Sequence, residues 1–574
     1  MDGCSRTGLD SALRHHPVSL LRAAPSLTLV MLLGPVAAGL AGTLLPAIGV
    51  MPALGAHQPG FGPVSDLLAW PGLPRAAGLS LWTGLVSTLL ALALCFAICA
   101  AWHGTRAFVW LERALAPLLS LPHAAAAFGL AFLIAPSGWI SRLIAPLAGW
   151  ERPPDVLILQ DHAGLALIAG LVLKELPFLL LMSLAALPAL RPGEALATAR
   201  TLGYGRMMGW AKTVLPRLYP QIRLPVYAVL AYSMSVVDVA MILGPGAPPT
   251  LAVQVLRWMS DPDLALRLRA AAGALLLLAL TLGALGLWRL GENITRRLAQ
   301  GWLTAGCRGR RDAAPRAIAL GTGVLGAGAL FAGLGLLALW SVAGFWGFPA
   351  LMPSSFTAQG WQHAPLGPAA ETAVIAGAAT AIALALTLAS LEAECRFGLV
   401  PGARALALLY LPLIIPQIAF LPGLQVLALI SGIDGTRGAV IAAHVVFVLP
   451  YVFLSLSDPW RGFDPRQAAV ARALGASTAR VFWRVRLPML LRPVLTATAV
   501  GCAVSVGQYL PTLLLGAGRV PTLTTEAVAL AAGGQRRLIG VTALAQTAAA
   551  FLPFVLALAI PALVFRNRRE MRHG

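Results

Sequence analysis

Ala197-Thr-Ala-Arg-Thr-Leu-Gly203 is the stretch that decides the fold of this chain, because it recurs as Ala469-Val-Ala-Arg-Ala-Leu-Gly475. A Leu-Pro pair follows each copy at the same distance, at Leu215-Pro216 and at Leu487-Pro488. Both copies lie between apolar segments. One structural element is therefore used twice in the chain, which is the sequence signature of an internal repeat.

The composition is that of a protein that lies in a lipid bilayer. Of the 574 residues, 58% are hydrophobic and 11% are charged, and the mean hydropathy is +0.80. Only helices and closed barrels satisfy the backbone in hydrocarbon. The apolar segments are about 20 residues long, as helices require, instead of alternating strands of about 10. The sequence predicts an all-α, polytopic membrane protein.

Hydropathy and charge together predict twelve membrane spans. We place them at residues 23–48, 80–102, 114–135, 163–189, 223–244, 269–288, 317–345, 369–391, 405–430, 438–456, 493–515 and 538–565. The first apolar stretch is too long for the core of a signal peptide, so we interpret it as an uncleaved span.

The net charge of +20 falls on one side of the membrane if both termini are cytoplasmic, as the positive-inside rule requires. Basic residues gather in the segment before residue 316 and in the tail after residue 565. Nucleic-acid binding is the other interpretation of such basic runs. Because these runs flank the spans, topology and contact with lipid headgroups explain them better.

The chain reads as a tandem duplication. The two halves align at an offset of 272 residues from the pair Arg200/Arg472 to the Pro-Thr-Leu stretches at 249–251 and 521–523. Earlier in each half they align at an offset of 294 residues, from Pro122/Pro416 to Gly129/Gly423. We predict a first permease repeat at 1–288, a basic cytoplasmic linker at 289–316 and a second repeat at 317–574. Six spans per repeat give both repeats the same orientation, related by an axis along the membrane normal.

The repeated stretch lies between the fourth and fifth span of each half, on the basic side. Its Ala-rich residues favour a short helix. Gly203 and Gly475 can supply the left-handed turn where that helix stops, and a second amphipathic stretch runs on to Leu-Pro. The pattern predicts a cytoplasmic helix-turn-helix in each half.

These residues resemble the EAA loop of the permease subunits of binding-protein-dependent ABC importers, whose pattern is E-A-A, three residues, G, nine residues, I-x-L-P. The Gly-to-Pro spacing agrees in both halves, whereas Ala197 and Ala469 stand at the position of the glutamate, and Thr213 and Val485 at that of the isoleucine. In that family the loop fits a groove on the ATPase subunit. The resemblance assigns this role to Ala199, Arg200, Leu202, Gly203, Leu215 and Pro216, and to Ala471, Arg472, Leu474, Gly475, Leu487 and Pro488.

The resemblance covers nearly the whole chain and implies its partners. They are two copies of a cytoplasmic ABC ATPase and a periplasmic solute-binding protein, at a bacterial inner membrane. Fused two-repeat permeases occur in ferric-iron and thiamine importers, and the stretch 236–245 is similar to an uncharacterised group related to the thiamine type. The substrate stays open among thiamine-like compounds, ferric iron and other small solutes.

The chain itself cannot be the ATPase. A Walker A loop needs Gly-Lys-Ser/Thr to hold phosphates and magnesium, and neither of the two lysines, Lys174 and Lys212, stands in such a loop. We expect no cofactor, no metal site and no enzymatic centre. Segments rich in Trp and Pro, at 70–74 and 345–349, are either a docking surface for the binding protein or interfacial anchors.

Ionisable and polar residues inside spans point to a translocation path. They are Lys174, Glu175, Asp238, His444 and Gln508. The alternative is internal pairing that holds the bundle together, for instance Lys174 with Asp238. An ion-driven secondary transporter with twelve spans is the other candidate for the whole chain, but it gives no reason for the repeated Gly and Leu-Pro spacing.

Overall fold

The computed structural model describes residues 20–52, 55–118, 120–399 and 402–566. Within them the chain is helical and has no strand, only two isolated bridges. The all-α prediction is confirmed. Most of the basic tail, after Arg566, lies outside the described residues.

Eight of the predicted spans are single long helices. They are α1 (Ala24–Ala47), α3 (Leu73–Trp102), α7 (Leu165–Leu190), α13 (Leu266–Thr304), α14 (Ala313–Val342), α16 (Leu366–Phe397), α19 (Arg437–Arg461) and α26 (Arg536–Val564). α13 extends well past the predicted end of its span. The basic segment 289–316 is therefore helical over its first part, and only residues 305–312 connect α13 to α14.

The other four predicted spans are broken into shorter helices. They correspond to α4 (Arg106–Leu118) and α5 (His123–Ile134), which α6 (Trp139–Ala148) follows; to α10 (Leu215–Ser235) and α11 (Asp238–Leu243); to α17 (Ala403–Ile414) and α18 (Gln417–Ile430); and to α23 (Leu491–Val506) and α24 (Leu510–Gly516). Pro122 and Pro416 stand directly before α5 and α18. The helices break here because proline restricts the residue before it and cannot continue a helix. The bend between α17 and α18 is 86°.

By length and hydropathy, nine helical segments of the described chain can cross a membrane, or eleven if each bent pair forms one span. The predicted span 223–244 is not among the eleven. It is helical as α10 and α11, but Arg217 and Arg223 lie in the first half of α10. These charges lower the hydropathy of the first half of α10.

The first helix of each predicted repeat packs against the other repeat. α1 lies along α18 and α16, and α14 lies along α5 and α3. Glycines make these crossings possible. A Cβ on Gly129 would lie 2.9 Å from the backbone of Gly333, a Cβ on Gly333 would lie 2.8 Å from that of Gly129, and a Cβ on Gly423 would overlap the carbonyl of Gly39.

The two crossings occupy corresponding positions. The spacing of 294 residues that relates Gly129 to Gly423 also relates Gly39 to Gly333. A hydroxyl cap is also present in both halves, at spacings of 272 and 292 residues: the Leu251 N–H donates to Ser80 Oγ at 3.0 Å, and the Leu523 N–H donates to Thr372 Oγ1 at 2.9 Å.

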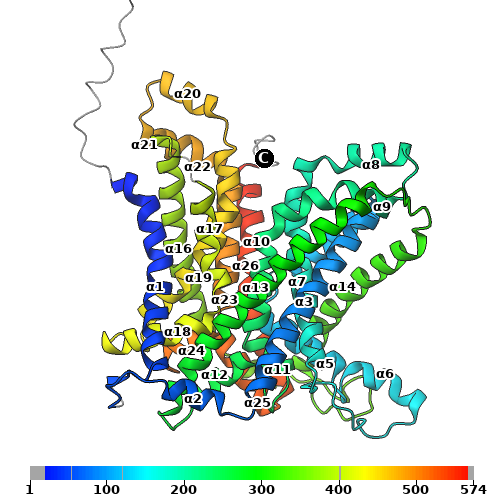
Figure 1. The fold of residues 1–574 in the computed structure, drawn as a ribbon, viewed down its shortest axis with the longest axis vertical. Coiled ribbons are helices and arrows are strands. Elements are labelled where there is room, and N and C mark those ends of the chain that lie inside the picture. Colours follow the sequence, from blue (N-terminus) through cyan, green and yellow to red (C-terminus); the bar gives the residue numbers. More distant parts are fainter. Residues whose placement is uncertain (1–19, 53–54, 119, 400–401, 567–574) are drawn as a thin grey trace, which may run out of the picture.

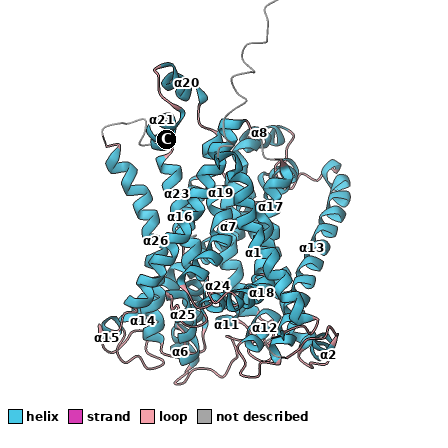
Figure 2. Cartoon of the chain, turned by 90° about the vertical axis from the view of Figure 1, so that its left-hand side faces the viewer, coloured by secondary structure: helices cyan, strands magenta, loops and turns pink. Residues whose placement is uncertain are grey.

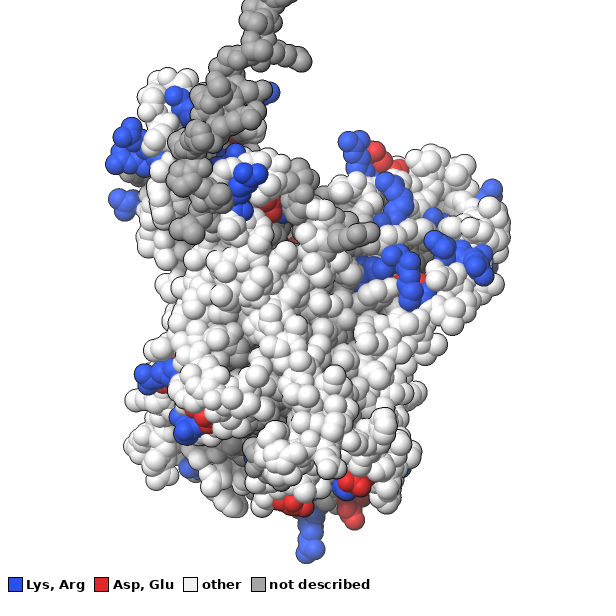
Figure 3. Space-filling view, turned by 60° about the vertical axis from the view of Figure 1, so that its left-hand side comes forward, with Lys and Arg blue, Asp and Glu red and all other residues white. Residues whose placement is uncertain are grey.

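The two ends of the molecule differ. Figure 1 shows α8 (Pro192–Thr201) and α9 (Arg206–Thr213) at the same end as α20 (Pro465–Ala473) and α21 (Thr478–Val481), on opposite sides of the molecule. The other end carries α2 (Gly62–Leu68), α12 (Leu251–Met259), α15 (Gln359–Gln362) and α25 (Leu523–Gly533), as Figure 2 shows from the side. Lys and Arg gather mainly around the first end (Figure 3), which agrees with the basic side predicted from the sequence.

Candidate coupling loops and transport path

The first repeated stretch forms a helix-turn-helix. α8 begins at Pro192, where its missing N–H costs nothing, and ends before Gly203, whose φ of +80° is left-handed. The Gly203 N–H donates to the Arg200 carbonyl at 2.9 Å, and the Tyr204 N–H donates to the Ala199 carbonyl at 3.1 Å. This is the glycine-terminated end that the sequence predicts, and α9 follows it.

The second stretch repeats this geometry. Gly475 has a φ of +82°, its N–H donates to the Arg472 carbonyl at 2.9 Å, and the Ala476 N–H donates to the Ala471 carbonyl at 3.0 Å. α20 is capped by Asp464, which accepts from the Arg466 N–H at 2.9 Å. The predicted helix-turn-helix is thus confirmed in both halves.

The turn of each loop presents an apolar side chain to solvent. Leu202 is 59% exposed and Leu474 is 83% exposed, beside the exposed Arg200 and Arg472. Ala199 is buried against α9 and Ala471 is half-buried, as are Leu215, Leu487 and Pro488, while Pro216 is exposed. An exposed leucine on a projecting turn is a surface that a partner protein can cover.

The second loop is held by ion pairs to its own half. Glu392 on α16 is buried and accepts from Arg486 Nη1 at 2.6 Å and from Arg396 Nε at 2.7 Å. The Arg486 guanidinium also lies 5.7 Å from the Trp460 ring. The loop is therefore joined to α16 through Glu392 and to α19 through Trp460.

The first loop meets the end of α3. Arg206 Nη2 donates to the carbonyl of His103, the residue that follows α3. Burial, together with the nearby positive charge of Arg206, lowers the pKa of His103 from its usual value of 6.5. A neutral imidazole therefore fits this contact better than a charged one.

Three of the predicted path residues, Lys174, Glu175 and Asp238, belong to one buried polar cluster. Glu175, buried on α7, lies 3.7 Å from His123 Nε2 on α5, and the His123 ring is 4.9 Å from the Tyr232 ring. Asp238, buried at the start of α11, is within electrostatic range of His123. Lys174 is buried next to Glu175 on α7.

Gln508 lies at a contact between helices of the second half. Gln417 Nε2 donates to Gln508 Oε1 at 3.3 Å. The neighbouring Tyr509 hydroxyl reaches Met241 Sδ of the first half at 3.7 Å. The two halves therefore meet at this level.

His444 has a different setting. Its two ring nitrogens lie 2.7 Å from Ser505 Oγ and 2.9 Å from Thr512 Oγ1. It is buried among α19, α23 and α24 of the second half, with both nitrogens satisfied. This arrangement holds three helices together and does not bring His444 into contact with Glu175 or Asp238.

His123 and Gln417 were not among the predicted path residues, although the sequence held a signal for them. Each directly follows the proline of the repeated Pro-to-Gly-Leu pattern, at Pro122 and Pro416, and the same 294 residues separate them. A polar residue at the start of a half-helix, in both repeats, is the pattern expected for a path lined by broken helices.

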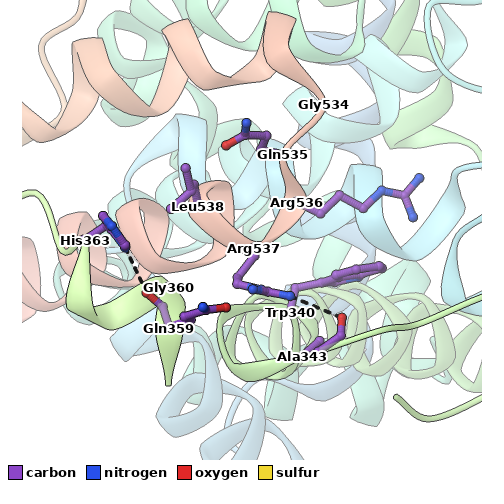
Figure 4. A pocket seen from close by; sticks show the side chains of 11 residues that line it. Trp340, Ala343, Gln359, Gly360, His363, Gly534, Gln535, Arg536, Arg537 and Leu538 are labelled. Carbon is purple, nitrogen blue, oxygen red and sulfur yellow. Dashed lines mark hydrogen bonds between the residues drawn. The ribbon is translucent and has the colours of Figure 1, made fainter. Parts of the chain in front are cut away.

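A hollow of about 560 Å³ opens on the opposite end, between the end of α14, α15 and the start of α26 (Figure 4). It is lined by Trp340, Gln359, His363, Gln535, Arg536 and Arg537 among others. Arg537 Nη2 donates to the Gly344 carbonyl at 3.3 Å, and the Arg536 guanidinium lies 5.1 Å from the Trp340 ring. No carboxylate of the described residues lies within ion-pair distance of either arginine.

The predicted outer segment 345–349 lies beside this hollow. Arg142 on α6 donates to the carbonyls of Gly347, at 2.8 Å, and Ala350, at 2.5 Å, and its guanidinium lies 5.0 Å from the Trp346 ring. The segment is thereby fixed to the first half.

Known permeases resemble this chain, one of them along almost its whole length. It is 34% identical over 518 residues to the inner membrane ABC transporter permease protein YnjC of Escherichia coli (strain K12), which covers 88% of this chain and 91% of that protein. It is 32% identical over 169 residues to the molybdenum transport system permease protein ModB of Mycobacterium tuberculosis, covering 26% of this chain and 64% of that protein. It is 31% identical over 139 residues to the spermidine/putrescine transport system permease protein PotC of Haemophilus influenzae, covering 24% and 50%.

Residues 381–570 also match the family described as binding-protein-dependent transport system inner membrane component. This match lies within the second predicted repeat, and the similarity to YnjC extends it over the first. Helices, apolar spans and sequence relatives agree: the chain belongs to this family and is a multi-pass inner-membrane permease subunit of an ABC transporter, not an enzyme.

Proposed function

We propose that this permease imports a small solute handed over by a periplasmic binding protein, and that two copies of a cytoplasmic ATPase drive it through the loops at 197–216 and 469–488. One observation carries the proposal. Two loops of the same geometry, with glycine turns at φ +80° and +82°, project from the same end of the molecule on its two sides. Two equivalent ATPase subunits would meet one loop each.

The proposed mechanism follows from this placement. Closure of the ATPase pair on ATP would draw the two loops together and rock the halves between inward-open and outward-open states. The tandem duplication, with repeats at 1–288 and 317–574, is supported by the corresponding glycine crossings at Gly39/Gly423 and Gly129/Gly333. The basic end, on which both loops lie, would face the cytoplasm together with both termini.

The polar cluster around Glu175 and Asp238 is the proposed path. It lies where the broken helices α5 and α11 meet α7 and α10, and Tyr509 of the second half lies within electrostatic range of Asp238. Gln508, through Gln417, adds a polar contact from the second half. His444 is assigned to packing, because both of its nitrogens are already bonded.

The outer hollow is the proposed contact for the binding protein. Arg536 and Arg537 offer positive charge with no carboxylate partner among the described residues, at the end opposite the coupling loops. An acidic patch on the binding protein would complement this surface.

The double variant Gly203→Asp with Gly475→Asp tests the proposal. Aspartate is strained at a left-handed φ and places a charge on each docking turn. We expect the ATPase to lose its coupling to transport while the chain still inserts, measured as solute uptake and ATP hydrolysis in proteoliposomes.

Gly193→Asp is the matched control. Gly193 lies exposed in the first turn of α8, has open space around it and suits an acidic side chain at a helix start. Transport that survives both turn substitutions would overturn the coupling assignment.

A further inference from the structure

The two coupling loops differ in what lies against them: the connector 305–312, between α13 and α14, is bound to the first loop. The Gly205 N–H donates to the Arg308 carbonyl at 2.8 Å, and the Met207 N–H donates to Asp312 Oδ2 at 3.1 Å. Lys212 Nζ donates to the Ala305 carbonyl at 2.5 Å. Three backbone or side-chain bonds thus hold the connector along the start and the end of α9.

Lys212 strengthens this contact. Its ammonium lies 5.2 Å from the Tyr204 ring and 5.1 Å from the Trp302 ring. Tyr204 belongs to the loop and Trp302 to the end of α13. The charge therefore joins the loop to α13 through two aromatic faces.

Gly205 is the residue that admits the connector. Its backbone, at φ −63° and ψ 159°, is open to any residue, and the corresponding Ser477 of the second loop has φ −65° and ψ 158°. A Cβ on Gly205 would overlap the carbonyl of Gly309. Glycine is needed here for the close approach of the connector, not for the conformation of the loop.

The second loop uses the same position in another way. Ser477 Oγ accepts from the Arg480 N–H at 3.3 Å and caps the helix that follows, as serine at an N-cap does. Around Gly475 a Cβ would meet open space, whereas at Gly203 it would lie 3.2 Å from Arg310 Nη2 and 3.6 Å from Arg308 Cδ. No other described segment lies against the turn at Gly475, whereas the side chains of Arg308 and Arg310 lie beside the turn at Gly203.

These arginines lack acidic partners. Arg308, Arg310 and Arg311 are exposed, and no carboxylate of the described residues lies within ion-pair distance of them. Arg310 Nε donates to the Gly203 carbonyl at 3.4 Å. A protein that reaches the first turn therefore meets Arg308 and Arg310, whose side chains border Gly203.

We propose that the connector 305–312 is part of the first docking surface, so that the ATPase subunit bound there is held by an acidic patch on Arg308, Arg310 and Arg311, while the subunit at the second loop meets a bare turn. This inference rests on the proposed function, since it takes the loops to be ATPase docking points. The two docking points are then chemically different, although their backbones correspond. Exposed charges on such a surface contribute modestly each and depend on salt.

Gly205→Ser separates the connector from the loop without damaging the loop. The new side chain overlaps Gly309 but supplies the helix cap that Ser477 supplies in the second half. Arg308→Ser with Arg310→Ser is the complementary variant, because it removes charge and leaves the bonds of the Arg308 carbonyl and of Asp312 in place. Ser477→Gly, at the corresponding position of the second loop, is the matched control.

The experiment measures binding of the ATPase subunit that co-purifies with the wild-type chain, after it has been purified alone. The full chain is placed in nanodiscs of phosphatidylcholine, and affinity is measured at low and at high salt. Release of the connector is followed independently by the distance between spin labels on Cys307 and on Thr201→Cys, in a chain whose other cysteines are replaced by alanine.

We expect Gly205→Ser to lengthen the label distance and both test variants to weaken binding at one of two sites by about tenfold, with a smaller loss on adding salt. Ser477→Gly should leave that site unchanged. Unchanged or tighter binding after release of the connector would overturn the inference alone. If the arginines serve anionic lipid instead, the variants differ from wild type only in nanodiscs that contain phosphatidylglycerol, which also overturns it. A wild-type chain that binds no ATPase would overturn the proposed function, and this inference with it.

Discussion

Single glycines decide where the helices of this permease cross. A Cβ on Gly333 of α14 would lie 2.8 Å from the backbone of Gly129, whereas a Cβ on Gly335, two residues further along the same helix, would meet open space. Both are glycines in one apolar helix, so the sequence alone does not tell them apart. Only the partner helix, α5, makes one of them essential.

The pair gives a matched test at this scale. We expect Gly333→Ala to destabilise the protein by about 1–3 kcal/mol, because the methyl group forces α14 away from α5. Gly335→Ala should be neutral or slightly stabilising, since alanine favours helix. Thermal unfolding in detergent measures both, and equal midpoints for the two variants would contradict the crossing.

For the buried polar residues, too, the sequence does not tell which of them contact one another. Lys174, Glu175, Asp238, His444 and Gln508 stood out as polar groups inside spans, and all five do lie in or beside the helix bundle. Which of them meet depends on helix rotation and on breaks such as that before His123. The pattern therefore predicted candidates, whereas the separation of His444 from the cluster needed the structure.

Among the elements, the first coupling loop and the end of α3 form a contact that should respond to pH. The pKa of His103 lies below its unfolded value of 6.5, first because of burial and then because of Arg206, with Glu112 acting in the opposite direction. The unfolded chain then binds a proton more readily than the folded one. Stability is fully present above pH 6.5 and is lost as the pH falls below that value.

We expect hydrogen exchange of the backbone around residues 103–106 and 206 to accelerate between pH 6.5 and pH 5, after correction for the intrinsic rate. His103→Asn should remove this dependence, because it keeps the backbone carbonyl that Arg206 uses and cannot titrate. A variant that keeps the full pH response would assign it to another group.

The elements themselves were largely predictable. Eleven of the twelve predicted spans correspond to apolar helices or bent pairs, and both glycine turns are left-handed as the motif predicts. The length of α13 was not predictable, because its last part is polar and is joined to α10 by Glu292, which accepts from the hydroxyls of Tyr219 and Tyr227. The contact between the connector and the first loop was not predicted either. The sequence held a signal for it, because Gly205 stands at the position that Ser477 occupies in the second repeat.

The whole molecule is held together by exchanged helices. α1 packs on α18 and α16, and α14 packs on α5 and α3, so each half contributes a helix to the other. Repeat periodicity predicts the halves but not this exchange, because an apolar helix with small residues on one face fits either neighbour equally well.

A chain divided between Gly306 and Cys307 tests the exchange. We expect the two separately encoded halves to co-purify as a folded pair when expressed together, since the crossed helices and the connector contacts do not need the peptide bond. A tag on one half and detection of the other by mass spectrometry measures this. Halves that insert but do not co-purify would contradict the packing of α1 and α14.

The same crossings also determine how long a helix stays without its partner while the chain is being synthesised. Gly39 meets Gly423, which the ribosome adds 384 residues later; at about 5–20 residues per second this is about 20–80 s. Gly333, in contrast, finds Gly129 already in the membrane. α1 therefore has no partner for Gly39 during that time, and this crossing forms only when the last third of the chain is being made.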